Sequence, residues 1–172
     1  VYVECGGRVD VSGKGYLPRR TYPNFQAHDS AYSAGGSHGG EGGRYSETGD
    51  QPMPIYGSVV NPADPGSGTG DATGGAGGGV VRAAIGVLIV DREVAADDTP
   101  GVQNAGAGGT INLQVGTISG SGSLHATGGS VEPNNGSISG GGGRVAVRYV
   151  QNLLKRTDGE ASVTAAPGEY SF

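Results

Sequence analysis

The sequence predicts an all-β fold, a right-handed parallel β-helix of stacked coils with a long glycine- and tyrosine-rich loop insertion. Three observations predict this class: a repeat, strand-like alternation within each repeat, and glycine-rich segments between the strands. The chain has 172 residues, of which 37 are glycine, 9 are proline, 2 are phenylalanine and none is tryptophan. Such small side chains fit a narrow stack of coils better than a two-sheet sandwich, whose wider core needs larger residues.

The repeat is found by shifting the chain by 30 residues, which overlays 79–97 on 109–127 without a gap. Apolar residues alternate with polar or small ones. They stand at odd-numbered positions before a shared glycine, Gly86 or Gly116, and at even-numbered positions after it. The matched apolar pairs are Val81 with Ile111, Ala83 with Leu113, Ile85 with Val115, Leu88 with Ile118, Val94 with Leu124 and Ala96 with Ala126. This alternation indicates strands with one buried face, which only neighbouring copies of the repeat can cover.

Partial copies follow at both ends of the chain. On the C-terminal side Val145, Val147, Tyr149, Val163 and Ala165 continue the pattern, and 150–157 is expected to depart from it, with at most one helical turn. At the start, Val3, Cys5, Val9 and Val11 are expected to occupy the positions of Leu88, Val90, Val94 and Ala96. We therefore expect one domain over 1–172, cut or processed from a longer chain. Its parts are a partial coil (1–12), an insert (13–78) and repeated coils (79–168).

The insert is too long to be an ordinary connection, and loops of this length are usually functional or disordered. Its larger side chains include five tyrosines (Tyr16, Tyr22, Tyr32, Tyr45 and Tyr56), with Phe25, Met53 and Ile55. These residues favour an insert that packs against a face of the coils. Ligand binding is the alternative, because loops rich in tyrosine and glycine make adaptable binding surfaces.

Two runs, GGTINLQVGTISGSGSLHATGG (108–129) and GGGGRVAVRYV (140–150), resemble the glycine-rich repeats of large extracellular and cell-surface, adhesin-like proteins. The opening GGRVDVSGKGYL (6–17) is similar to the start of the same module. The resemblance extends from Val1 to about Gly168 and implies a parallel β-helix, an extracellular location and no established enzymatic activity. Departures are Asp91-Arg92-Glu93, where the other copy has Ser121-Gly122-Ser123, and 152–156, and both are candidate interaction surfaces.

Charge and composition argue against several classes of partner. A net charge of −5 without a basic stripe opposes nucleic-acid binding. The longest apolar run, 83–90, is far shorter than the ~20 residues of a membrane-spanning helix, so no membrane insertion is expected. The single Cys5 excludes an internal disulfide and is expected to be a buried thiol, with pairing outside this chain as the alternative. Asn135 begins a glycosylation sequon in a turn, whose use depends on the source organism.

An enzymatic alternative is a β-helix acting on acidic polysaccharides, which needs carboxylates and a base on one outer face. Residues at the same position of successive repeats form a column. The predicted outward-facing columns are Arg82 with Asn112, Gln114 with Arg148, and Asp10 with His125 and Thr164. No column holds two carboxylates, and a further coil separates Asp10 from His125. The acidic and histidine residues of the insert match no catalytic template: His28, Asp29, His38, Glu41, Glu47 and Asp50. We therefore predict no catalytic residue and no enzyme.

No metal or cofactor site is predicted either. His28 and His38 lack a third ligand at a diagnostic spacing and are expected to be solvated. Gly66-x-Gly68-x-Gly70-Asp71 is only part of a calcium-binding Gly-Asp repeat, with Asp64, Asp71, Asp97 and Asp98 as weak candidates. Gly141-x-Gly143-x-x-Ala146 is followed by a strand-like run, which opposes dinucleotide binding. Thr110, Thr117 and Thr127 fall in different columns, which opposes ice binding.

These observations favour a structural or adhesive segment of a secreted or cell-surface protein, such as a subunit of an extracellular filament. Expected partners are other copies or other segments of the same surface protein, with glycans as a further candidate. The alternative is a carbohydrate-binding or polysaccharide-degrading β-helix protein.

Overall fold

Three parallel strands of eleven residues dominate the computed structural model of this chain: β5 (Val80–Val90), β7 (Thr110–Gly120) and β9 (Arg144–Leu154). The structure describes residues 1–4, 6–23, 25–26, 34–44, 53–99, 104–131, 137–154 and 162–168. These residues contain ten strands and no helix, which confirms the predicted all-β class for the described part of the chain.

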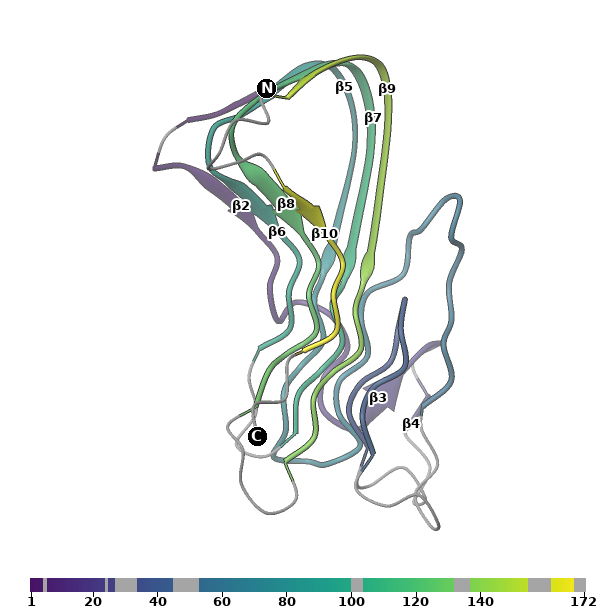
Figure 1. Ribbon diagram of the computed structural model, residues 1–172. Helices are drawn as coiled ribbons and strands as arrows, with labels where there is room; N and C mark the ends of the chain where they lie inside the picture. Colours follow the sequence, from purple (N-terminus) through teal and green to yellow (C-terminus); the bar gives the residue numbers. More distant parts are fainter. Residues whose placement is uncertain are drawn as a thin grey trace.

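The strands form two parallel sheets with matching order. Sheet A has the order β1-β5-β7-β9, where β1 is Tyr2–Val3. Sheet B pairs the short strands that follow each member of sheet A: β2 (Arg8–Asp10), β6 (Glu93–Ala95), β8 (Ser123–His125) and β10 (Val163–Thr164). In Figure 1 the long strands run side by side and bend at one end toward sheet B, whereas the glycine-rich segments lie at the other end.

The predicted repeat register is confirmed across both sheets. Val81 pairs with Ile111, Leu88 with Ile118 and Val94 with Leu124. Further pairs are Ala83 with Leu113, Ile85 with Val115, Ile111 with Val145, Leu113 with Val147, Val115 with Tyr149 and Leu124 with Val163. The alternation of the sequence thus identified both the paired strands and the relative positions of their residues.

Two register predictions were wrong. The N-terminal strand places Val3 opposite Val90, not opposite Leu88, although Val9 lies opposite Val94 as expected. The turn between β1 and β2 is therefore two residues longer than the turn between β5 and β6. The stretch from Val150 to Leu154 forms no helical turn, because it continues β9 beside β7, although Asn152 stands opposite Ile118 and so breaks the apolar pattern. Residues 155–157 of the predicted departure lie outside the described residues.

The hydrophobic core lies between the two sheets and is built from the inward columns of the repeat. The middle repeat, formed by β7 and β8, is the best covered: Ile111, Leu113, Ile118 and Leu124 have at most 2% of their surface exposed. Each such side chain contributes roughly 1.5–3 kcal/mol by its burial. The other buried members of the cluster are Val115 and Ala126 of the same repeat and Leu88, Val90, Val94 and Ala96 of the repeat before it. The apolar residues that the alternation places on the inward face therefore form the hydrophobic core.

At the other end of the coils, glycine-rich segments pack backbone against backbone. Gly66 donates its N–H to the oxygen of Gly78 (2.8 Å), and Gly78 donates to that of Ala107 (2.9 Å). A Cβ added at Gly78 would lie 2.0 Å from the oxygen of Ala96, which only a shift of backbone would relieve. Only glycine therefore fits this spacing. Residues 66–78 belong to the insert, so this part of the insert packs among the glycine-rich segments, which together form a glycine layer.

The insert also covers part of the outer face of sheet A. The side-chain amide of Asn112 donates to Asn61 Oδ1 (3.0 Å) and to the oxygen of Pro62 (2.7 Å). The hydroxyl of Thr110 donates to the oxygen of Asp64 (2.7 Å). The small antiparallel pair β3 (Arg20–Thr21) and β4 (Phe25–Gln26) belongs to the same insert and lies on this side of the molecule in Figure 1.

Candidate functional site

The outer face of sheet A carries an open groove with a volume of about 570 Å³. Its lining residues come from corresponding positions of three neighbouring strands: Ala84, Ile85 and Gly86; Gln114, Val115 and Gly116; Arg148, Tyr149 and Val150. A smaller hollow of about 270 Å³ adjoins it, shares Ala84 and Gln114, and adds Arg82, Ala83 and Asn112. The two hollows together extend across β5 and β7 and reach β9.

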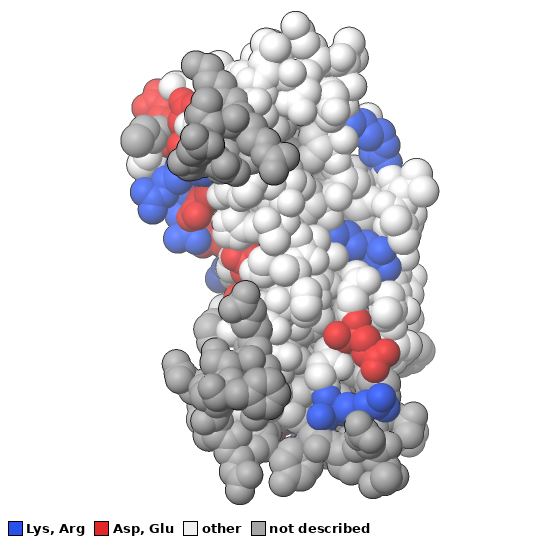
Figure 2. Space-filling model, in the orientation of Figure 1, with Lys and Arg blue, Asp and Glu red and all other residues white. Residues whose placement is uncertain are grey.

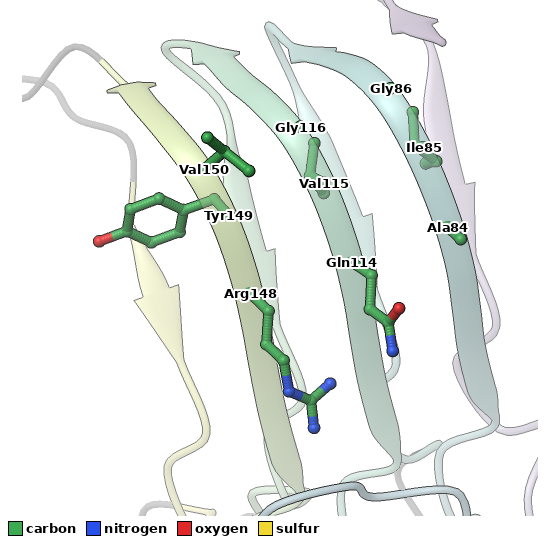
Figure 3. A pocket seen from close by; sticks show the side chains of 9 residues that line it. All are labelled: Ala84, Ile85, Gly86, Gln114, Val115, Gly116, Arg148, Tyr149 and Val150. Carbon is green, nitrogen blue, oxygen red and sulfur yellow. The ribbon is translucent and has the colours of Figure 1, made fainter.

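The shape of the groove follows from the repeat. Gly86 and Gly116 occupy the position where the inward parity changes and the strands bend. A Cβ added at Gly86 would meet no atom within 4 Å, so the space above this residue is open. Figure 3 shows Gln114 and Arg148 extending on the same side of the sheet, with Tyr149 and Val150 on β9 at one margin. Tyr149 is 52% exposed and Val150 is 89% exposed.

The lining of the groove is basic. The residues around the two hollows include Arg82 and Arg148 and no aspartate or glutamate. Arg148 donates through Nη1 to Asn112 Oδ1 (3.2 Å) and through Nη2 to the oxygen of Val60. Both acceptors are neutral, so they orient the guanidinium without compensating its charge. In Figure 2 the upper right of the molecule shows basic residues without acidic neighbours, whereas the left side mixes both signs.

The outer face of sheet B carries a different feature, a cluster of ion pairs. His125 Nδ1 lies 2.8 Å from Asp97 Oδ2, and His125 Nε2 lies 3.6 Å from Glu93 Oε2. Arg8 bridges Glu93 (2.8 Å) and Asp10 (2.6 Å). Residues on or just after three neighbouring strands of sheet B, β2, β6 and β8, are thereby joined on one face.

The pKa values of this cluster follow from its contacts. The hydrogen bond to Asp97 raises the pKa of His125 above its ordinary value, despite partial burial. Burial by itself raises the pKa of Asp97, but hydrogen bonds from His125 and Thr127 outweigh it and hold that pKa below its ordinary range. Both ring nitrogens of His125 face carboxylates, so the imidazole is fixed between two acids. This geometry joins residues on or just after neighbouring strands of sheet B.

The strand register confirms the predicted outward column of Asp10, His125 and Thr164. The sequence pattern did not indicate the grouping of His125 with Asp97 and Glu93, because those carboxylates reach His125 from neighbouring columns. Glu93 lies opposite Ser123, two residues before His125, and Asp97 accepts hydrogen bonds from Thr127, two residues after it. Diagonal neighbours of this kind lie within reach of long side chains.

One histidine of the insert was predicted wrongly. His38 is fully buried and not solvated, and its Nδ1 lies 2.9 Å from the oxygen of Gly108. Burial lowers its pKa. Its ring packs on that of Tyr56 (4.9 Å), which stacks on Tyr22 (5.2 Å). The Nε2 of His38 has no hydrogen-bond partner among the described residues.

The calcium candidates do not converge. Asp71 accepts hydrogen bonds from the backbone and hydroxyl of Thr73, and Asp97 is engaged by His125. Asp98 is 7% exposed and accepts the N–H of Gly106 (2.8 Å), and burial raises its pKa to about 7. Within the described ranges, no group of three or more His, Cys, Asp or Glu side chains is placed to hold a metal ion.

Several predicted features lie outside the described residues: Cys5, His28, Asp29, Glu47, Asp50 and Asn135. Glu41 is described and is exposed. Two residues of the charged departure Asp91-Arg92-Glu93 make contacts within the molecule. Tyr2 donates its hydroxyl to Asp91 (2.7 Å), and Arg8 forms an ion pair with Glu93. The described part of the chain contains no helix with the length and apolarity needed to cross a bilayer.

Comparison of the chain with protein-family models, curated proteins and solved structures finds no match. The functional interpretation therefore depends on the groove, the ion-pair cluster and the exposed ends of the stacked sheets.

Proposed function

We propose that this chain is a segment of a right-handed parallel β-helix that has a structural or adhesive role in a secreted or cell-surface protein. Its partners are further coils, from other copies of the chain or from other segments of the same protein. One observation carries the proposal: the inward apolar residues of the central strand β7 are buried, whereas those of β9 and of the first half of β5 are only partly buried.

The contrast is visible within single columns. Ile111 and Leu113 of β7 are at most 2% exposed. Val145 and Val147, which occupy the same two columns in β9, are only partly buried. On the other side, Val81 and Ala83 of β5 are also only partly buried. Each outer coil thus has a row of inward side chains that another coil would cover, as its neighbours cover the middle coil.

The backbone supports the same direction of assembly. β9 is the last strand of sheet A, so the outer edge of Arg144–Leu154 has no strand partner among the described residues. At the opposite edge, β1 pairs only with Ile89 and Val90, which leaves most of β5 without a neighbouring strand in the described part. Unpaired edges are templates for additional strands. Because all strands of sheet A are parallel, the β9 edge of one copy matches the β5 edge of the next in head-to-tail order.

Sedimentation velocity over a range of protein concentrations tests this proposal. The wild-type chain is expected to form larger species as its concentration rises. Val147→Asp places a charge among the partly buried inward residues of β9 and is expected to leave a monomer. Gln151→Asp introduces a carboxylate at an exposed position of the same strand and serves as the matched control, which we expect to associate like the wild type.

Circular dichroism verifies that both variants keep their β structure, and Tyr149→Lys provides a second variant of the same face if Val147→Asp unfolds. A wild-type chain that stays monomeric at every concentration would contradict end-to-end stacking. Equal association of Val147→Asp, Tyr149→Lys and the wild type would contradict the role assigned to this column.

A further inference from the structure

We propose that the groove on the outer face of sheet A binds an extended, carboxylate-bearing oligosaccharide. The groove lies on the face of the sheet and not at the ends of the stack, so this inference does not rest on the stacking proposal. It concerns the two adjoining hollows that share Ala84 and Gln114, together with the arginines on either side of them.

The spacing of the two groove arginines suits an extended ligand. Arg82 lies on β5 in the column of Ala146, and Arg148 lies on β9, two strands away and two residues further along. Strands are about 4.8 Å apart and residues rise about 3.3 Å, which separates the two Cα atoms by roughly 12 Å on a diagonal across β7. The groove therefore offers two cationic positions with Gln114 between them. A polymer with regularly spaced carboxylates can reach both positions.

Charge determines the class of ligand. The three strands beneath the groove carry arginines and no acidic residue, and the described neighbours of Arg148 are neutral oxygens. The exposed Arg82 makes no ion pair within the described residues. An Arg–carboxylate contact is a charge-assisted hydrogen bond with two parallel donors, which favours a ligand with carboxylates over a neutral one.

The remaining lining favours a sugar over other anions. Gln114 is exposed and offers both a donor and an acceptor to ligand hydroxyls. An acidic peptide would bind most readily by adding a strand at a sheet edge, whereas the groove lies over strands that are paired on both sides at β7. Nucleic acid is disfavoured by the net charge of −5, because its affinity depends on many phosphate contacts.

Isothermal titration calorimetry of the full chain with hexagalacturonate at low salt tests this site. The wild type is expected to bind, and Arg82→Gln and Arg148→Gln are each expected to weaken binding about tenfold, since each removes one charged hydrogen-bonding partner. Arg92→Gln makes the same change of charge at an exposed turn outside the groove. This matched control is expected to bind within about twofold of the wild type.

A second probe separates charge from shape. The fully methyl-esterified hexamer has the same sugar backbone without carboxylates, and we expect at least about a tenfold loss of affinity. The inference is overturned if hexagalacturonate does not bind, if the ester binds equally well, or if Arg92→Gln loses as much affinity as Arg82→Gln. Equal binding of hexaglutamate or of a single-stranded oligonucleotide would show a general anion site and overturn the assignment to a sugar.

Discussion

Replacing Asp98 with asparagine is expected to stabilise the protein at neutral and alkaline pH. Asp98 is 7% exposed, and its carboxyl group packs against the backbone of Gly129 while it accepts the N–H of Gly106. Burial, with a smaller contribution from the neighbouring Asp97, raises its pKa from 3.8 to about 7. Asparagine retains an acceptor oxygen for Gly106 and removes the charge whose burial is unfavourable.

The expected size of the effect follows from the two pKa values. Between about pH 4 and pH 7 the folded protein keeps a proton on Asp98 that the unfolded chain has lost, so the free energy of unfolding falls as pH rises. About three pH units at ~1.4 kcal/mol each give an upper value of about 4 kcal/mol above pH 7. Asp98→Asn is therefore expected to raise the free energy of unfolding by about 2–4 kcal/mol at pH 8 and by little at pH 4.

Urea unfolding followed by circular dichroism at pH 4, 6 and 8 measures this difference. Asp97→Asn is a matched control of opposite sign, because the hydrogen bonds of Asp97 with His125 and Thr127 hold its pKa down despite burial. Its stabilising contribution is present above its ordinary pKa and is lost as pH falls. Asp97→Asn should cost about 1.5–3 kcal/mol at pH 7. The reasoning is refuted if Asp98→Asn has the same effect at pH 4 and pH 8, or destabilises the protein at pH 8.

Three further predictions concern the ion pairs, the glycine layer and the core. The contact with Asp97 raises the pKa of His125, so its contribution is fully present below the ordinary histidine pKa of 6.5 and is lost as pH rises through the folded value. The difference in unfolding free energy between the wild type and His125→Gln should therefore shrink from pH 6 to pH 9; a constant difference would contradict this. Gly78→Ala should lower the melting temperature sharply because its Cβ would lie 2.0 Å from a carbonyl oxygen, whereas Gly86→Ala has open space and should have little effect; equal shifts would oppose the tight-packing account. Leu113→Ala should cost about 2–5 kcal/mol by urea unfolding, and Val147→Ala less because Val147 is only partly buried; the reverse order would argue against the assigned core.

The strands and their register were largely predictable because the apolar alternation recurs in β5, β7 and β9, and the first two share a glycine at the bend (Gly86 and Gly116). Predictions failed where local length or composition departed from the repeat. The turn after β1 is longer than its counterpart after β5, which displaced the predicted position of Val3 by two residues. Asn152 stands opposite Ile118, so a polar residue in an apolar column hid the continuation of β9.

The sites were less predictable than the strands. The outward columns through Gln114 and Arg148 were correct, and the parity change at Gly86 was a visible signal of the bend in the groove. The ion pairs of His125 were not predictable, because its carboxylate partners reach it diagonally from neighbouring columns and do not belong to its own column. The burial of His38 depends on glycine segments distant in sequence, including Gly108, closing around it, and local sequence gives no sign of this.

Electron microscopy of the purified chain, combined with fibre diffraction, tests the central claim of stacked coils most directly. Head-to-tail addition predicts rods that lengthen with protein concentration, with a reflection near ~4.8 Å along the rod axis from strands stacked in that direction. Uniform single particles at all concentrations, with no such axial reflection, would contradict assembly through the open edges of β5 and β9.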